Sequence, residues 1–138
     1  MHALGLLTCR PGDPLTCRAI ATEFRVSEAH LSKVLQRLVK AGLLVSARGP
    51  KGGFSLAREP ASVSLIEVFE AIEGPIKPVE CFFSEPICDG GSCVLGKVIA
   101  DVNRTFSVYL SERNLEDIAT VFEGRCFGTV RIDIDVAG

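Results

Sequence analysis

Residues 26–42 read VSEAHLSKVLQRLVKAG, and this stretch decides how the rest of the chain is interpreted. Its apolar residues recur with the three- and four-residue spacing of a helix that buries one face. Ser27 is a favourable N-cap residue, and Gly42 can adopt the positive φ that commonly ends a helix. We therefore predict a helix between these two residues. Its buried face comprises Leu31, Val34, Leu35, Leu38 and Val39.

The opposite face of this helix is polar and basic. It comprises Ala29, His30, Ser32, Lys33, Gln36, Arg37 and Lys40. A second helix is predicted just before it, capped by Thr16 and running to about Phe24, with a turn at Arg25 and Val26. Two helices joined by a tight turn, the second with a hydrogen-bonding outer face, are typical of the helix-turn-helix DNA-binding motif. Lys33 and Arg37 are suited to neutralising DNA phosphates.

A β-hairpin is predicted directly after the helix-turn-helix. Residues 43–45 and 54–56 have the apolar character of short strands, and the RGPKGG sequence of residues 48–53 is a turn. The hairpin is either an ordinary surface element with solvated charges or a DNA-contacting wing with Arg48 and Lys51 at its tip. Its position after a helix-turn-helix favours the wing.

The charge distribution supports a nucleic-acid partner, although the net charge of −2 by itself argues against one. Residues 1–60 contain nine Lys or Arg and four acidic residues, which gives +5. Residues 61–138 contain six Lys or Arg and thirteen acidic residues, which gives −7. A basic half joined to an acidic half is expected of a DNA-facing module with an attached unit of another kind.

Three further helices and one strand are predicted after the hairpin. Ser64 and Glu67 form a capping-box pattern at the start of a helix that Gly74 ends. Asn114 caps a short helix over residues 115–119, and residues 130–136 alternate like an edge strand unless they are disordered. Between them, one helix has the a/d spacing of a helix–helix seam. The seam residues are Leu95, Ile99, Val102, Phe106 and Tyr109.

This seam has two interpretations. The helix either belongs to the core of its own domain or pairs two copies of the chain. Pairing is favoured because helix-turn-helix proteins commonly read palindromic sites as two-fold dimers.

Cys81, Cys88 and Cys93 form a cluster within a loop marked by prolines and glycines. Soft thiolate ligands suit an iron–sulfur cluster or zinc. Zinc prefers four closed ligands and commonly a C-x₂-C pair, which this sequence lacks. The three other cysteines, Cys9, Cys17 and Cys126, are scattered, and we interpret them as small buried hydrophobes or incidental thiols.

Several classes of protein are excluded by the sequence. No apolar run is long enough to span a membrane, and the N-terminus has no basic signal-peptide region, so we expect a cytoplasmic protein. We find no catalytic constellation and no phosphate-cradling loop, so we do not expect an enzyme. The expected fold is mostly α with a small β-hairpin (α+β), that is, a winged helix-turn-helix followed by a long dimerisation helix.

Residues 15–60 together with the cysteine loop resemble the IscR/NsrR-type (Rrf2) family of winged-helix regulators. The motifs responsible are VSEAHLSKVL at 26–35, LVKAGL at 38–43, RGPKGGF at 48–54, and IEG at 72–74 before three cysteines. The resemblance covers about residues 2–119. It implies a homodimer that places the helix between Ser27 and Gly42 in the major groove of duplex DNA and the wing at the minor groove. The residues implied to contact DNA are Ser27, Ala29, His30, Ser32, Lys33, Arg48 and Gly49.

The same resemblance assigns Cys81, Cys88 and Cys93 as ligands of a 2Fe–2S or 4Fe–4S cluster. Some relatives take a fourth ligand from a His three residues after the last Cys, where this chain has Gly96. Relatives also begin with a fuller first helix, and this sequence starts inside it, so either the natural start lies upstream or those features are lacking.

The expected organisation is a DNA-binding domain (1–73), a cluster-binding loop (74–93), a dimerisation helix (94–112), and a C-terminal helix and tail (113–138). The expected function is a transcription regulator whose operator affinity is switched by the iron–sulfur cluster. The alternatives are the same regulator sensing through zinc or thiol oxidation, or an iron–sulfur carrier or redox protein.

Overall fold

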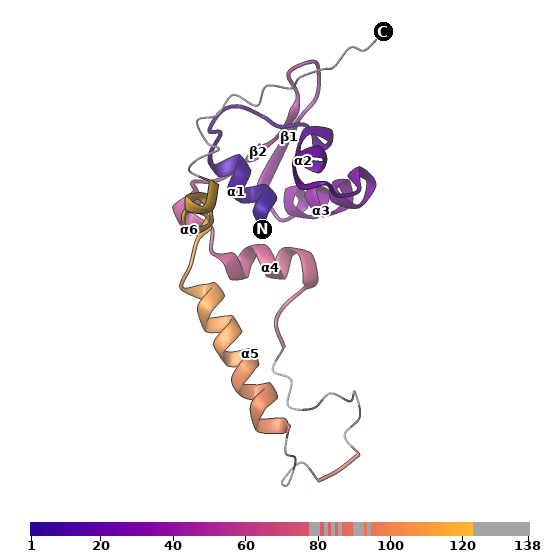
Figure 1. Cartoon of the computed structure of the whole chain (residues 1–138), viewed down its shortest axis with the longest axis vertical. Coiled ribbons are helices and arrows are strands. Elements are labelled where there is room, and N and C mark those ends of the chain that lie inside the picture. The colour runs from indigo at the N-terminus through magenta and orange to yellow at the C-terminus, as the bar shows by residue number, and fades with distance from the viewer. Residues whose placement is uncertain are drawn as a thin grey trace.

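The computed structural model describes residues 1–77, 81, 83, 85, 87–89, 93 and 95–122. A helical body carrying a two-stranded hairpin is followed by a long helix that leads away from it (Figure 1). This architecture confirms the mostly helical fold with a small wing. Among the described residues, no helix is long and apolar enough to cross a membrane. The elements are α1 (His2–Thr8), α2 (Cys17–Phe24), α3 (Glu28–Lys40), β1 (Leu44–Ala47), β2 (Gly53–Leu56), η1 (Pro60–Ser62), α4 (Leu65–Glu73), α5 (Gly96–Ser111), α6 (Leu115–Ala119) and η2 (Thr120–Phe122).

Helix α3 has the predicted bounds and the predicted buried face. The Ser27 hydroxyl accepts a hydrogen bond from the His30 amide at 3.3 Å, which fixes the first turn. At the other end Gly42 has a φ of +73°, and its amide donates to the carbonyl of Val39 while the Leu43 amide donates to that of Leu38. This pattern is a Schellman C-terminus, as the glycine predicted. Leu31, Leu35 and Leu38 are buried in the core, and Val34 and Val39 are partly buried.

The hairpin pairs β1 with β2 in antiparallel register, with Leu44 opposite Leu56. The second strand ends at Leu56 as predicted, and the other three strand ends lie one or two residues from their predicted positions. The loop before α2 adds a short bridge that the sequence analysis missed: the Leu15 amide donates to the Phe54 carbonyl at 3.0 Å, and the Phe54 amide to the Leu15 carbonyl at 2.8 Å. Gly53, with a φ of +156°, permits this approach, because an added Cβ would lie 2.6 Å from the Leu15 backbone. The wing is therefore anchored to the body.

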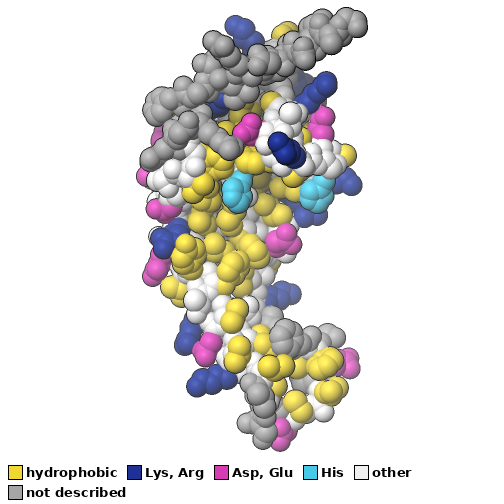
Figure 2. All heavy atoms as spheres, in the orientation of Figure 1, with side chains coloured by type: hydrophobic (Ala, Val, Ile, Leu, Met, Phe, Trp, Pro, Cys, Tyr) yellow, Lys and Arg dark blue, Asp and Glu magenta, His cyan; other side chains and the backbone are white. Residues whose placement is uncertain are grey.

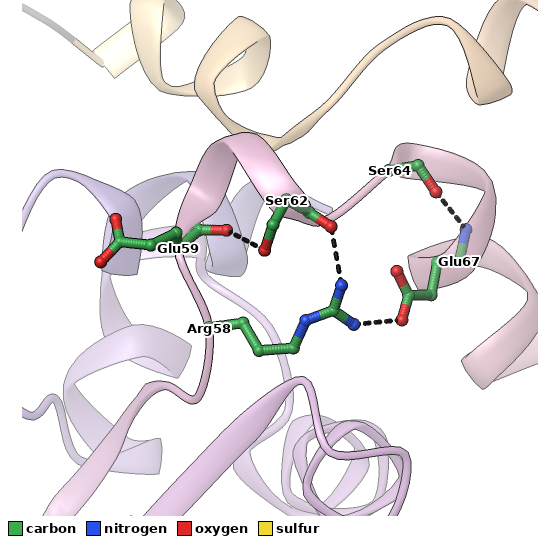
Figure 3. A network of polar contacts seen from close by, with 5 residues as sticks. All are labelled: Arg58, Glu59, Ser62, Ser64 and Glu67. Atoms are coloured by element: carbon green, nitrogen blue, oxygen red, sulfur yellow. Dashed lines mark hydrogen bonds and ion pairs between the residues drawn. The ribbon is translucent and has the colours of Figure 1, made fainter.

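A polar network joins the end of the hairpin to the start of α4 (Figure 3). The Arg58 guanidinium pairs with the Glu67 carboxylate and donates to the Ser62 carbonyl at 2.7 Å. The Ser64 hydroxyl accepts from the Glu67 amide at 3.4 Å, which confirms the predicted N-cap of α4. The Glu67 side chain, predicted to complete the capping box, is paired with Arg58. These contacts tie α4 to the hairpin.

Helix α5 extends from the body, and α6 returns to it. Phe69 of α4 meets Phe106 of α5 edge to face, with ring centroids 5.2 Å apart. Asn114 and Asp117 form a capping box at the start of α6, as the N-cap prediction required. Helix α6 then packs against α1, where a Cβ on Gly5 would lie 2.6 Å from Ile118 Cγ2. The strand predicted at residues 130–136 lies outside the described residues.

Candidate nucleic-acid interface and cysteine segment

The outer face of α3 is available for contact along its first turns. Ser27, Ala29, His30 and Lys33 are exposed, and Ser32 is partly buried. The Ser27 hydroxyl already serves as an acceptor for the helix cap, so its hydrogen atom remains to be donated. The preceding turn is tight, because Arg25 takes a left-handed φ of +53° and the Val26 amide bonds the Ala21 carbonyl at 3.0 Å. A cation and a hydroxyl are thus presented on a rigid helix start.

The tip of the hairpin is exposed and shaped by glycines. Arg48, Gly49 and Lys51 are all exposed. Gly49 has a φ of +110°, and its carbonyl accepts the Gly52 amide at 2.9 Å. Figure 1 shows the hairpin beside α2 and at the opposite end of the molecule from the start of α5. The two predicted sets of DNA-contacting residues therefore belong to neighbouring parts of one body.

Arg37, also predicted to contact DNA, has a hydrogen-bond partner on another helix of the protein. It is exposed on α3, and its Nη1 donates to the main-chain carbonyl of Ile72 at 2.8 Å. Ile72 belongs to the last turn of α4. No sequence signal could have revealed this contact, because the two residues lie 35 positions apart.

Cys81, Cys88 and Cys93 are free thiols on the segment between α4 and α5. Cys88 is exposed and the other two are partly buried; the Cys81 sulfur accepts from the Phe83 amide at 3.4 Å. Several residues between them lie outside the described part of the chain. Within the described part, no group of three His, Cys, Asp or Glu side chains is arranged to hold a metal ion. The donor set itself, three free soft sulfur atoms, fits an iron–sulfur cluster or zinc.

Two further cysteines, Cys17 and Cys9, lie in the helical body within the described part of the chain. Burial raises the pKa of the Cys17 thiol above its ordinary value, and the nearby Glu28 carboxylate raises it further. Cys17 therefore stays a neutral thiol, in keeping with its predicted incidental role. Cys9 is disulfide-bonded, which corrects the expectation of an incidental thiol at that position. Its side chain lies at the end of α1 where α6 returns, 3.8 Å from the Ala119 carbonyl, close to a part of the chain remote in sequence. Cys126 lies outside the described residues.

One face of α5 is apolar and uncovered. Leu95, Val102 and Tyr109 are 52%, 61% and 53% exposed, and Phe106 is 41% exposed despite its contact with α4. Ile99, also predicted for the seam, is partly buried. Hydrophobic side chains follow the helix in Figure 2, and a shallow hollow of about 580 Å³ lies on this face. Val98 also lines it; its position four residues before Val102 was a signal in the sequence that could have identified it.

Comparisons with known proteins agree with this geometry. The model of the Rrf2 family, described as iron-dependent transcriptional regulators, matches residues 1–120. An rrf2-like HTH-type transcriptional regulator of Rhodobacter capsulatus is 36% identical over 110 residues, which span 75% of this chain and 73% of that protein. The structure of CymR, the global cysteine regulator of B. subtilis, is similar with a TM-score of 0.69 and 27% identity, over 86% of this chain and 88% of that one. T. potens IscR, at 24% identity, shares the fold with a TM-score of 0.67, over 93% of this chain and 85% of that one.

Proposed function

The chain belongs to the Rrf2 family of transcriptional regulators, and from this premise we propose that it is a homodimeric, cluster-sensing regulator that binds duplex DNA. One observation carries the proposal: the exposed start of α3 stands on the same rigid body as a wing with Arg48 and Lys51 at its tip. The match to the family model and the relatives confirm the predicted family, and the members of this family are transcription regulators, not enzymes.

In this proposal α3 enters the major groove. Its exposed residues Ala29, His30 and Lys33 approach base edges and phosphates, while Ser27 and Ser32 supply shorter hydrogen-bonding groups. Arg48 and Gly49 enter the adjacent minor groove, where an arginine responds to groove width and negative potential more than to base identity. Lys51 adds a phosphate contact. Each cation that neutralises a phosphate adds nearly one unit to the dependence of log affinity on log salt.

Two copies pair through the apolar face of α5. Large side chains that are half exposed or more on one helical face are costly to leave in water. A two-fold arrangement covers this face with the same face of the second copy and sets two α3 helices at a fixed spacing. The residues proposed to meet across the axis are Leu95, Val98, Val102, Phe106 and Tyr109, with Ile99 at the edge of the contact.

Cys81, Cys88 and Cys93 would hold the iron–sulfur cluster, with the fourth ligand still to be identified. Such a cluster, when bound, supplies a redox couple whose potential responds to its protein surroundings. The exposed Cys88 and the partly buried Cys81 and Cys93 place the sulfur donors at the surface, where a cellular signal has access to them. The chain provides three free cysteines on one segment, which suits a site that responds to a signal.

The proposal is tested with full-length protein purified without oxygen. Iron, acid-labile sulfide and the visible spectrum are measured first. Duplexes are then selected from a random library and the affinity is measured against salt concentration. Iron and sulfide in the protein, together with steeply salt-dependent binding, support the proposal. Colourless protein that binds DNA would point to thiol or zinc sensing, whereas cluster transfer without DNA binding would point to a carrier.

A further inference from the structure

Arg37 links the helix proposed to read DNA to the helix that precedes the cysteine segment. Its Nη1 donates to the Ile72 carbonyl at 2.8 Å. The carbonyls of the last turn of a helix have no partner within the helix, and they favour a nearby cation. Helix α4 has no basic residue in its own last turn, so Arg37 provides that cation from α3. The contact therefore stabilises the end of α4 and fixes α3 against it.

The end of α4 is also where the chain departs toward Cys81. Gly74, with a φ of +88°, ends the helix, and its amide donates to the Glu70 carbonyl at 2.9 Å. The Glu70 carboxylate then accepts the Ile76 amide at 3.2 Å. The backbone is thus held up to Ile76, five residues before Cys81.

The other end of the cysteine segment bears on the same helix. Helix α5 begins at Gly96, three residues after Cys93, and its Phe106 packs against Phe69 of α4. Figure 1 shows α4 lying between α3 and α5. The helices on both sides of the cysteine segment thus meet at α4, and the Arg37 bond joins α4 to α3.

We propose that Arg37 is a positioning residue that couples the state of the cysteine segment to the orientation of α3. The proposal rests on the function proposed above, because it requires that loading the cysteines changes DNA affinity. A change in the segment alters the last turn of α4, the Ile72 carbonyl moves or turns, and α3 follows through the Arg37 guanidinium. The proposal implies two orientations of α3 in equilibrium. A cluster bound by the cysteines shifts this equilibrium only if its interactions differ between the two orientations. The link from Arg37 to Ile72 provides a physical route for that difference.

The test compares wild type, Arg37→Ala and Lys40→Ala. Lys40 is an exposed cation on the same helix, so Lys40→Ala removes the same positive charge from α3 as Arg37→Ala does. Each protein is prepared loaded, with ferrous iron and sulfide under anaerobic conditions, and stripped by a chelator. The affinity of both forms for the duplex selected by wild type gives a loaded-to-stripped ratio. Hydrogen exchange at the amides of residues 73, 74, 76 and 77 reports directly on the end of α4, since Pro75 has no amide hydrogen.

We expect a wild-type ratio that differs from one by about 5- to 150-fold, the usual range of coupling between sites. Arg37→Ala should bring the ratio close to one and speed exchange at the amides of residues 73, 74, 76 and 77, while Lys40→Ala should weaken both forms equally and leave exchange unchanged. Equal weakening of both forms in Arg37→Ala, or unchanged exchange, would overturn the coupling role and leave Arg37 a phosphate contact. A wild-type ratio of one would instead overturn the switching function itself, and the coupling role with it, before any variant is compared.

Discussion

Replacing Val102 by Asp should dissociate the homodimer proposed above. Burying a whole Val side chain contributes about 1.5–3 kcal/mol, and Val102 is 61% exposed, so covering it contributes about 1–2 kcal/mol per copy. The two-fold axis doubles this loss to about 2–4 kcal/mol. Since 1.4 kcal/mol is a factor of ten, the dissociation constant should rise by about 30- to 700-fold. Burying the new carboxylates without partners adds to this effect.

Sedimentation equilibrium over a range of concentrations measures the effect, with circular dichroism to confirm that the helices remain. Val108→Asp is the matched control, because Val108 is also exposed, at 48%, but lies six residues further, about 120° around the helix. It should remain dimeric. An unchanged dissociation constant in Val102→Asp, or equal dissociation in both variants, would refute pairing through this face of α5.

Three further predictions concern the wing, the cysteines and the fold. Arg48→Ala should weaken binding to the selected duplex by about 1–3 kcal/mol in a fluorescence anisotropy titration, and unchanged affinity would remove the wing tip from the interface. Cys88→Ala should abolish the visible absorption of anaerobically prepared protein while a folded dimer remains by sedimentation; unfolding would make the residue structural. Gly53→Ala should lower the free energy of unfolding in urea by about 1–3 kcal/mol, because a Cβ there meets the Leu15 backbone and the φ of +156° disfavours it; an unchanged midpoint would contradict the close approach.

The helices could be predicted because their ends are determined locally. Each predicted N-cap is a short polar side chain that bonds an amide two or three residues ahead, and the structure shows all four of these bonds. The four caps are Thr16, Ser27, Ser64 and Asn114. The buried face of α3 likewise follows from a spacing that is visible within thirteen residues.

The missed features involve residues far apart in the chain. Leu15 bridges the hairpin because the loop before α2 passes alongside β2, and only the folded backbone brings the two together. The Glu67 carboxylate pairs with Arg58, a stronger charged partner than the main-chain amide that the capping pattern assigned to it. The packing of α6 against Gly5 similarly depends on the path of the whole chain. No local pattern encodes these contacts.

In the candidate site, too, the local features could be predicted from the sequence and the contacts between distant residues could not. Residue type and spacing predicted the exposed positions on α3, the glycines of the wing and most of the apolar face of α5. The role of Arg37 could not be predicted, because exposure and positive charge suit a phosphate contact and a helix-end contact equally well. Its bond to the Ile72 carbonyl, on which the proposed positioning role rests, is visible only once α4 is placed.

In the regulator proposed above, a signal at the cysteine segment between α4 and α5 has two routes to DNA binding. Through α4 and Arg37 it can turn α3 within one copy, and through α5 it can change the spacing between the two copies of α3. The Phe69–Phe106 contact connects α4, which belongs to the first route, with α5, which belongs to the second. They differ in what the DNA must contain. The first route changes the affinity for a single half-site, whereas the second changes which half-site spacing is preferred and leaves single half-site binding unaltered. Measuring loaded and stripped protein on duplexes with one half-site, and on pairs at several spacings, therefore separates them.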